Sequence, residues 1–189
     1  MTFVSRTHAR TPAWMAIAAI VMLLGLMPSS AHAQMPNPGS YDLTPFLGVS
    51  FGGDADGGSF AIGGAVAYNY STRLAFEGEL ALLTNATDDT SAVDVRVLTF
   101  TGNALYRFNT RTRFAPYAAV GIGLGRTSFQ APAGSDSTST DLAFNVGGGV
   151  KAEWQERIMF RADLRFFQLA DISPSFWRLY GGISFRFDR

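Results

Sequence analysis

The chain has 189 residues, no cysteine, and 15 basic residues balanced by 15 acidic ones. The absence of cysteine excludes a lipoprotein anchor, a disulfide framework and a thiolate metal site. The neutral charge balance gives no electrostatic basis for binding nucleic acid.

The N-terminus has the three parts of a secretory signal peptide, and we interpret residues 1–33 as a helical leader of this kind. The parts are a basic region at Arg6, His8 and Arg10, an apolar run at residues 13–27, and a small-x-small cleavage motif at Ala31 and Ala33. The run of about 15 apolar residues is shorter than the ~20 of a spanning helix. Cleavage after Ala33 is therefore favoured over a membrane anchor.

Cleavage at this point would remove both histidines, His8 and His32. The mature chain would keep all 15 acidic residues and lose two of the 15 basic ones, for a formal charge of about −2. A chain without histidine has no Ser-His-Asp triad, no histidine proton shuttle and no histidine-ligated zinc. We therefore predict that the protein is not an enzyme and uses no cofactor or metal.

After a linker at residues 34–40, apolar and polar residues alternate with a period of two through one domain, residues 41–189. This pattern predicts eight β-strands, at residues 43–52, 59–71, 73–84, 93–108, 113–127, 140–154, 157–169 and 176–187. The strands exceed the ~5–6 residues usual in soluble sheets. They reach the ~9–11 residues that a tilted strand needs to cross a bilayer.

Each predicted strand has an apolar face and a polar face. In the seventh strand, Phe160 and Leu164 alternate with Arg161 and Arg165. Aromatic residues make up 13% of the chain and recur on the apolar face, in greater bulk than a narrow interior could hold, whereas the other face is rich in Gly and Ala. We therefore predict the membrane arrangement, with the apolar face towards lipid; a soluble ligand-binding barrel is the alternative.

Aromatic residues also gather near the predicted strand ends, as expected for interfacial girdles. They are Tyr68, Tyr70, Tyr106, Phe108, Phe114, Tyr117, Trp154 and Trp177.

Short and long connections alternate along the chain. The tight ones lie at 71–72, 109–112 and 155–156, and the longer ones at 53–58, 85–92, 128–139 and 170–175. Outer-membrane barrels have short periplasmic turns and longer external loops, and an even number of strands places both mature termini in the periplasm. The predicted fold is all-β: an eight-stranded antiparallel up-and-down transmembrane β-barrel in the bacterial outer membrane, closed because lipid cannot satisfy sheet edges.

Three segments carry a family resemblance: TGNALYRF at 101–108, PYAAVGIGLG at 116–125 and NVGGGVK at 145–151. They resemble the outer-membrane β-barrel domain of the OmpA/OmpX/opacity-protein class, over essentially the whole mature chain. Residues 181–187, GGISFRF, resemble the family's C-terminal strand, which implies that Phe185 and Phe187 are recognised by the barrel-assembly machinery. The other expected partners are outer-membrane lipids and lipopolysaccharide.

Nine charged residues fall on the face predicted to line the interior. They are Glu77, Glu79, Lys151, Glu153, Arg161, Asp163, Arg165, Arg178 and Arg186. Buried charges are tolerated only when they are paired, and four acids with five bases can pair almost completely. We interpret these residues as a structural ion-pair network; a conducting or gated pore is the alternative.

The remaining polar motifs are interpreted as loops. Asp54, Asp56, Asp88, Asp89 and Asp136 are read as solvated loop tips rather than a divalent-cation site, because their spacing matches no cation-binding loop. Residues 134–139 are read as a mobile hydrophilic loop or adhesive tip. The glycines at 121, 123 and 125 do not form a nucleotide site, since no helix pattern follows them.

The leading functional hypothesis is a structural outer-membrane protein that maintains envelope integrity and has loops available for surface contact. A porin-like channel for small solutes is the second hypothesis. An outer-membrane enzyme that modifies lipid A is the third, and the absence of histidine from the mature chain disfavours it. The sequence names no surface partner.

Overall fold

The computed structural model describes residues 37–52, 59–85, 94–108, 113–130, 137–170 and 175–188. Several sequence predictions lie outside these residues: the signal peptide with Ala31 and Ala33, residues 34–36 of the linker, and the loop aspartates Asp54, Asp56, Asp88, Asp89 and Asp136. Within the described ranges, no helix has the length and apolar character of a membrane span.

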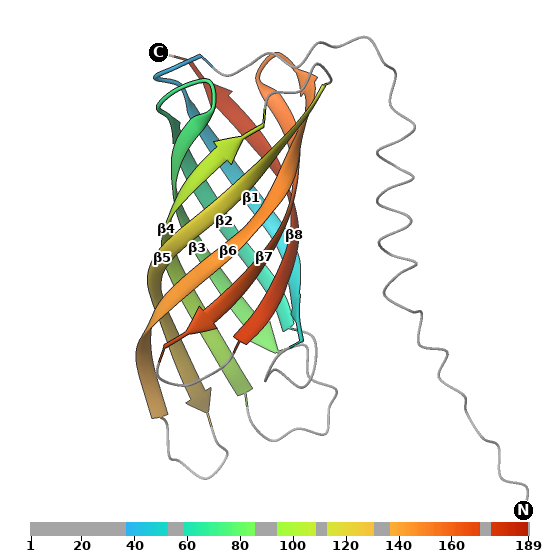
Figure 1. Cartoon of the computed structure of the whole chain (residues 1–189). Helices are drawn as coiled ribbons and strands as arrows, with labels where there is room; N and C mark the ends of the chain where they lie inside the picture. The colour runs from blue at the N-terminus through green and yellow to red at the C-terminus, as the bar shows by residue number, and fades with distance from the viewer. Residues whose placement is uncertain are drawn as a thin grey trace, which may run out of the picture. The chain divides into compact units, whose positions relative to one another are not determined.

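The described chain forms eight β-strands (Figure 1). They are β1 (Tyr41–Phe51), β2 (Ser59–Asn69), β3 (Leu74–Asn85), β4 (Asp94–Arg107), β5 (Phe114–Gln130), β6 (Ser137–Gln155), β7 (Ile158–Leu169) and β8 (Ser175–Phe187). Consecutive strands pair antiparallel, and β1 also pairs with β8, so the sheet closes into a barrel. The predicted strand number and up-and-down topology are confirmed.

The largest departure from the predicted bounds is the hairpin of β5 and β6. β5 ends three residues later than predicted, and β6 begins three residues earlier. Residues 137–139, predicted as part of a mobile loop, belong to β6 and pair with β5, as in the pair Thr127 and Ser139. A Ser/Thr-rich run is typical of loops, but threonine is β-branched and suits a strand once a partner is available.

The two ends of the barrel are named here by their connections. The start of β1, the end of β8 and the turns at residues 70–73 and 156–157 lie at the turn end (Figure 1). The end of β1 and the start of β8 lie at the opposite, loop end. Gly52 follows β1 there with a φ of 72°, in the left-handed region that glycine adopts without steric cost.

Burial alternates from residue to residue along each strand. In β7, Arg161 and Arg165 are 2% and 0% exposed, whereas Leu164 is 40% exposed. In β8, Arg178 is 0% and Phe185 37% exposed. The expectation that apolar side chains face outwards and charged ones inwards is therefore confirmed.

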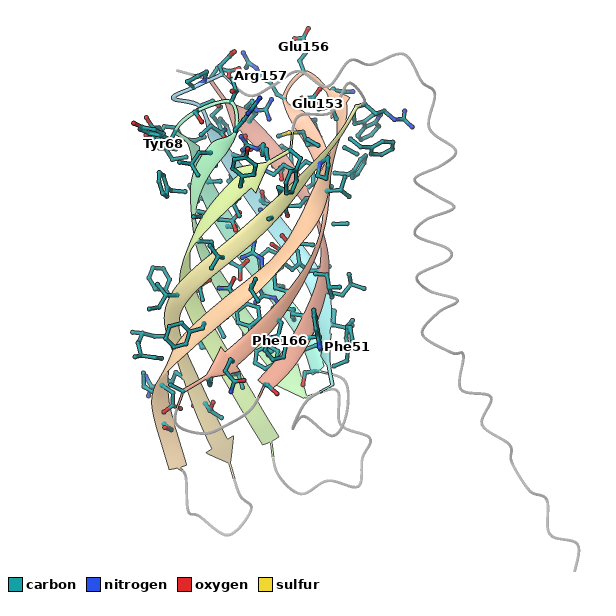
Figure 2. All side chains as sticks on the ribbon, in the orientation of Figure 1. Phe51, Tyr68, Glu153, Glu156, Arg157 and Phe166 are labelled. Atoms are coloured by element: carbon teal, nitrogen blue, oxygen red, sulfur yellow. The ribbon has the colours of Figure 1, made fainter. Side chains whose placement is uncertain are left out.

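The outer wall has the dimensions and the aromatic girdles of a membrane span. A strand of 11 residues, such as β1, is about 36 Å long at ~3.3 Å per residue and crosses roughly 25 Å when it is tilted by about 45°. At the turn end the rings of Tyr41 and Tyr68 lie 5.1 Å apart, and at the loop end those of Phe166 and Trp177 lie 5.3 Å apart. Tyr68 and Phe166 lie at opposite ends of the barrel (Figure 2).

Tyr117 was expected in an outer girdle, and this expectation is wrong. Tyr117 is 3% exposed and points into the barrel, because the alternation of β5 puts it on the same face as Gly121. Its phenol group has a polar partner there, which makes the interior position favourable for a residue with an apolar ring and a hydroxyl tip.

The interior also holds more aromatic bulk than the sequence indicated. Phe46, Phe167, Phe176 and Tyr180 are all buried inside the barrel. The many glycines and alanines of the inward face, such as Ala61 at 0% exposure, provide the space for these rings.

Candidate functional site in the barrel interior

The central feature of the interior is a group of ion pairs that we call the central network. It comprises three acids and three bases: Glu77, Glu79, Asp163, Arg161, Arg165 and Arg178. β3 supplies both glutamates, β7 supplies Arg161, Asp163 and Arg165, and β8 supplies Arg178. All six side chains are 0% exposed, and their formal charges sum to zero.

Arg165 lies at the centre of this network. Its Nε donates to Asp163 Oδ1 at 2.9 Å and its Nη2 to Glu77 Oε1 at 2.8 Å, while Nη1 lies 3.3 Å from Glu79 Oε2. Arg161 pairs with Glu77 and donates from Nη2 to Asp163 Oδ2 at 2.9 Å, and Arg178 pairs with Glu79. Each carboxylate therefore meets at least one guanidinium, which is the condition for burying these charges.

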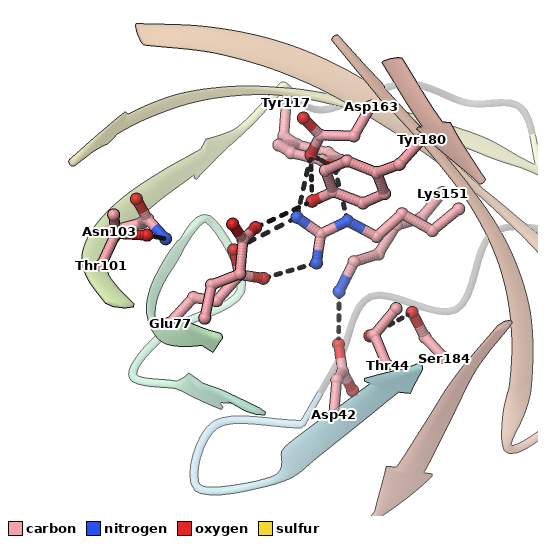
Figure 3. Close-up of polar contacts among 12 residues, drawn as sticks. Asp42, Thr44, Glu77, Thr101, Asn103, Tyr117, Lys151, Asp163, Tyr180 and Ser184 are labelled. Atoms are coloured by element: carbon pink, nitrogen blue, oxygen red, sulfur yellow. Dashed lines mark hydrogen bonds and ion pairs between the residues drawn. The ribbon is translucent and has the colours of Figure 1, made fainter. Parts of the chain in front are cut away.

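Two tyrosines complete the polar contacts of the central network (Figure 3). The Tyr117 hydroxyl donates to Asp163 and accepts a hydrogen bond of 2.7 Å from Arg161 Nε. The Tyr180 hydroxyl donates to Asp163 Oδ2 at 3.0 Å. These phenol groups connect β5 and β8 to the charges of β7.

A second set of buried charges, the turn-end cluster, surrounds Asp42 at the start of β1. Lys151 Nζ lies 2.7 Å from Asp42 Oδ2, Arg186 Nε lies 3.2 Å from Asp42 Oδ1, and Arg107 Nη2 lies 3.8 Å from Asp42 Oδ2. Arg186 also pairs with Glu153 at 3.5 Å. Three bases here meet two acids, so the cluster has a formal charge of +1.

On the loop-end side of the central network, the interior contains an apolar layer beside buried polar residues such as Asp141. This apolar layer is formed by buried rings and aliphatic side chains: Phe46, Leu83, Phe167, Leu169 and Phe176, with alanines between them. The rings of Phe167 and Phe176 stack at 5.2 Å. The guanidinium of Arg178 lies 4.4 Å from the Phe167 ring centroid, so a cation–π contact joins the network to the layer.

A short chain of amides crosses β4, β5 and β6 beside the central network. Asn145 Nδ2 donates to Asn103 Oδ1 at 2.9 Å, and Asn103 Nδ2 donates to Thr101 Oγ1 at 3.3 Å. Gly121 lies between the two asparagines, and a Cβ at this position would collide with the Asn103 side chain. The glycines at 121, 123 and 125 lie within a strand, so they are not at the strand-to-helix junction of a nucleotide site.

The comparison with protein families decides the identity of this fold. The model for the outer membrane protein beta-barrel domain matches residues 17–187. The chain belongs to this outer membrane β-barrel family. Its location is accordingly the bacterial outer membrane, and the resemblance found in the sequence is confirmed. No individually curated protein matches the chain in sequence.

Solved outer membrane barrels share the fold at low sequence identity. Neisserial surface protein A has a TM-score of 0.66 and 19% identity, covering 79% of this chain and 97% of that one. The attachment invasion locus protein Ail of Yersinia pestis has a TM-score of 0.59 and 14% identity, covering 80% and 100%. The N-terminal β-barrel domain of Pseudomonas aeruginosa OprF has a TM-score of 0.55 and 19% identity, covering 80% and 100%.

In this outer membrane barrel, all nine charged residues predicted for the interior lie on the inward face. Eight are buried and Glu153 is half-buried. Sequence reasoning missed Asp42 and Arg107 of the turn-end cluster. Asp42 precedes the predicted first strand, and Arg107 could have been found from its alternation with outward Tyr106 and Phe108. The mixed pattern of that strand, in which Leu105 is also buried, weakened the signal.

The two phenylalanines predicted as an assembly signal lie on the outward face of β8. Phe185 and Phe187 are 37% and 55% exposed and lie opposite Leu43 and Tyr41 of β1. Their recognition by the assembly machinery stays a prediction. Among the described residues, no three His, Cys, Asp or Glu side chains are grouped so that they could hold a metal ion.

Proposed function

We propose that this protein is a non-enzymatic, structural outer membrane barrel whose interior is closed to solutes. The proposal rests on one observation, the order of the buried groups along the barrel axis. From the turn end to the loop end, the turn-end cluster, the central network and the apolar layer follow one another. Arg165, Arg178 and Phe167, which belong to the network and the layer, are each 0% exposed. A solute would have to displace paired charges and stacked rings in turn.

The energetic reason is the cost of separating buried charges. Breaking one buried ion pair costs roughly 3–5 kcal/mol, and Arg165 alone contacts three carboxylates. A permanent path through the barrel would require several such separations at once. An ion-pair network of this kind functions as a plug that also holds β3, β7 and β8 together.

Conductance tests the proposal. The mature protein, refolded and inserted into planar bilayers, should show no stable, reproducible channels, and vesicles that contain it should swell in sugar solutions no faster than empty vesicles. Stable channels of one conductance would contradict the closed interior and favour the porin-like alternative.

We also propose that the loop end faces the cell exterior and that both mature termini are periplasmic. The support is the contrast between short turns, such as residues 156–157, and the longer connections at the other end. The chain has no cysteine, so single cysteines can report the orientation. With a membrane-impermeant maleimide, Asp88→Cys should be labelled on intact cells, and Glu156→Cys only after the outer membrane is permeabilised; the reverse pattern would overturn this orientation.

Biogenesis in this proposal begins with cleavage after Ala33 and continues with recognition of the last strand by the barrel-assembly machinery. Mass spectrometry of the protein from outer membranes should find Gln34 as the first residue. An N-terminus upstream of Ala31 would contradict the proposed cleavage site.

One structural neighbour has been solved with a sulfated ligand. Ail of Yersinia pestis has been solved in complex with the heparin analogue sucrose octasulfate, at 14% identity to this chain. In this chain the loops carry Asp54, Asp56, Asp88, Asp89 and Asp136. This acidic composition disfavours a sulfated polyanion as the loop ligand, because like charges repel.

A further inference from the structure

The outer wall of the barrel carries very few charges. Eleven charged strand residues point inwards and are buried: Asp42, Glu77, Glu79, Arg107, Asp141, Lys151, Arg161, Asp163, Arg165, Arg178 and Arg186. Among strand residues with described side chains, the charged ones that are exposed on the outside are Arg96 and Arg126. Among the acids whose side chains the structure describes, none forms an ion pair with either arginine.

The two arginines are neighbours on adjacent strands. In the register of β4 and β5, Arg96 pairs with Ser128 and Arg126 pairs with Leu98. The arginines are therefore diagonal partners on one face, and such partners lie about 7–8 Å apart in antiparallel sheets. Two like charges at this separation repel each other unless an anion lies between them.

Their position coincides with the boundary between the apolar wall and polar residues. Towards the turn end, the next outward residues are Leu98 and Leu124, which are 42% and 50% exposed. On β6, Thr140 lies opposite Arg126, and Thr138, nearer the loop end, lies opposite Ser128. The cost of an arginine on the lipid-facing wall falls from the middle of the membrane to the interface, so this boundary is where an outward arginine is tolerated.

Further towards the turn end, beyond the outward residues Leu98, Phe100 and Leu124, the outer wall of the same strands has a hollow. It has a volume of about 640 Å³, and its lining includes outward residues of β3, β4 and β5 such as Phe76, Gly78, Gly102 and Ile122. Gly78 and Gly102 are paired across β3 and β4 and have no side chains to fill the space. An acyl chain that descends from a headgroup at the arginines would enter this hollow.

We propose that Arg96 and Arg126 bind a phosphate of a phosphorylated glycolipid, lipid A, in the outer leaflet of the membrane. This inference rests on the proposed orientation, in which the loop end faces outwards. A phosphomonoester carries close to two negative charges and three acceptor oxygens, enough for two guanidinium forks. The phosphodiester of a glycerophospholipid has one charge and two free oxygens, so it satisfies the pair less completely.

The test is a titration of the refolded mature protein in detergent micelles with bisphosphorylated lipid A, with bound lipid counted by native mass spectrometry. The double variant R96Q/R126Q should bind lipid A at least tenfold more weakly than the wild type, and each single variant should be intermediate. The matched control is Arg157→Gln, an exposed arginine in a turn at the opposite end, which should leave binding unchanged. Dephosphorylated lipid A should bind the wild type as weakly as lipid A binds the double variant.

Three results would overturn the proposal: equal lipid A binding by the wild type and the double variant, an equal loss in R157Q, or phosphatidylglycerol binding as tight as that of lipid A. Heat-modifiable gel mobility checks that each variant is folded. The cysteine-labelling experiment measures orientation separately, and conductance measures closure, so failure of the lipid site is distinguishable from failure of the proposed function.

Discussion

Arg165 illustrates how single residues stabilise the interior of this barrel. Its guanidinium contacts carboxylates from β3 and β7 and donates to the Tyr180 hydroxyl at 3.2 Å. Transfer of an isolated charge into such a site is very unfavourable, and the paired geometry offsets that cost. The contribution of Arg165 therefore depends on the acids around it.

Replacing Arg165 with methionine should lower the free energy of unfolding by about 3–5 kcal/mol, because three buried carboxylates would then share two arginines. Urea titration of the protein in lipid vesicles, followed by gel mobility, measures this change. The control Arg157→Gln, in an exposed turn, should change stability by less than about 0.5 kcal/mol. An R165M variant as stable as the wild type would show that the central network contributes no net stability.

Gly121 is a second residue whose role is set by its neighbours. Gly121→Ala should destabilise the barrel by about 1–3 kcal/mol, because the new methyl group overpacks the Asn103–Asn145 contact. Gly78→Ala is the matched control, since a Cβ there meets nothing within 4 Å, and its effect should stay within about 0.5 kcal/mol. The same urea titration compares the two, and equal effects would contradict the steric explanation.

At the scale of the element, register is enforced by the charges on each strand. A slip of β7 by one residue would turn Arg161 and Arg165 towards lipid, at a cost of about 2–4 kcal/mol each near mid-membrane. β8 also closes the sheet, because it pairs with both β7 and β1. The same closure removes every unpaired edge, which lipid could not satisfy.

The double variant F185S/F187S should reduce the amount of folded barrel in the outer membrane several-fold if these two residues form the assembly signal. The control is Phe76→Ser on β3, which is 50% exposed on the same outer wall. The folded fraction is measured by the mobility shift between unheated and boiled samples. A similar loss in F76S would indicate a general loss of apolar surface in place of a specific signal.

At the scale of the whole molecule, the interior is built in successive layers with different chemistry. The apolar layer with Phe167 and Phe176 lies on the loop-end side, and the central network lies beneath it. Both layers consist of buried side chains. Closure of the barrel to solutes is thus expected to survive damage to one layer.

The variant F167A/F176A tests this redundancy. It should lower stability by about 3–5 kcal/mol per substitution through the cavity left behind, and planar bilayers should still show no stable channels because the ion pairs persist. Phe100→Ala, at a site 59% exposed on the outer wall, is the control for loss of a ring without loss of interior packing. Channels in F167A/F176A would assign closure to the apolar layer alone.

Much of this fold could be predicted from the sequence because period-two alternation is a local property of a strand. Residues such as Arg161, Asp163 and Arg165 in β7 reveal their shared face without knowledge of any partner strand. Strand number, topology and the inward face followed from that pattern and from the lengths of the connections. The extension of β6 to Ser137 could not be predicted from that pattern, because a polar run becomes a strand only when a neighbouring strand pairs with it.

The sequence by itself determined that the charged side chains of this barrel lie on one face of each strand and the apolar side chains on the other. Only the tertiary structure decided which acid meets which base, that Asp42 and Arg107 join the buried charges, and that Arg96 and Arg126 are neighbours on the outer wall. The physical reason is that a side chain's face depends on its own strand, whereas ion pairs depend on the register between strands that are distant in the chain. Glu77 and Arg161, 84 residues apart, meet only because the sheet is twisted and closed on itself.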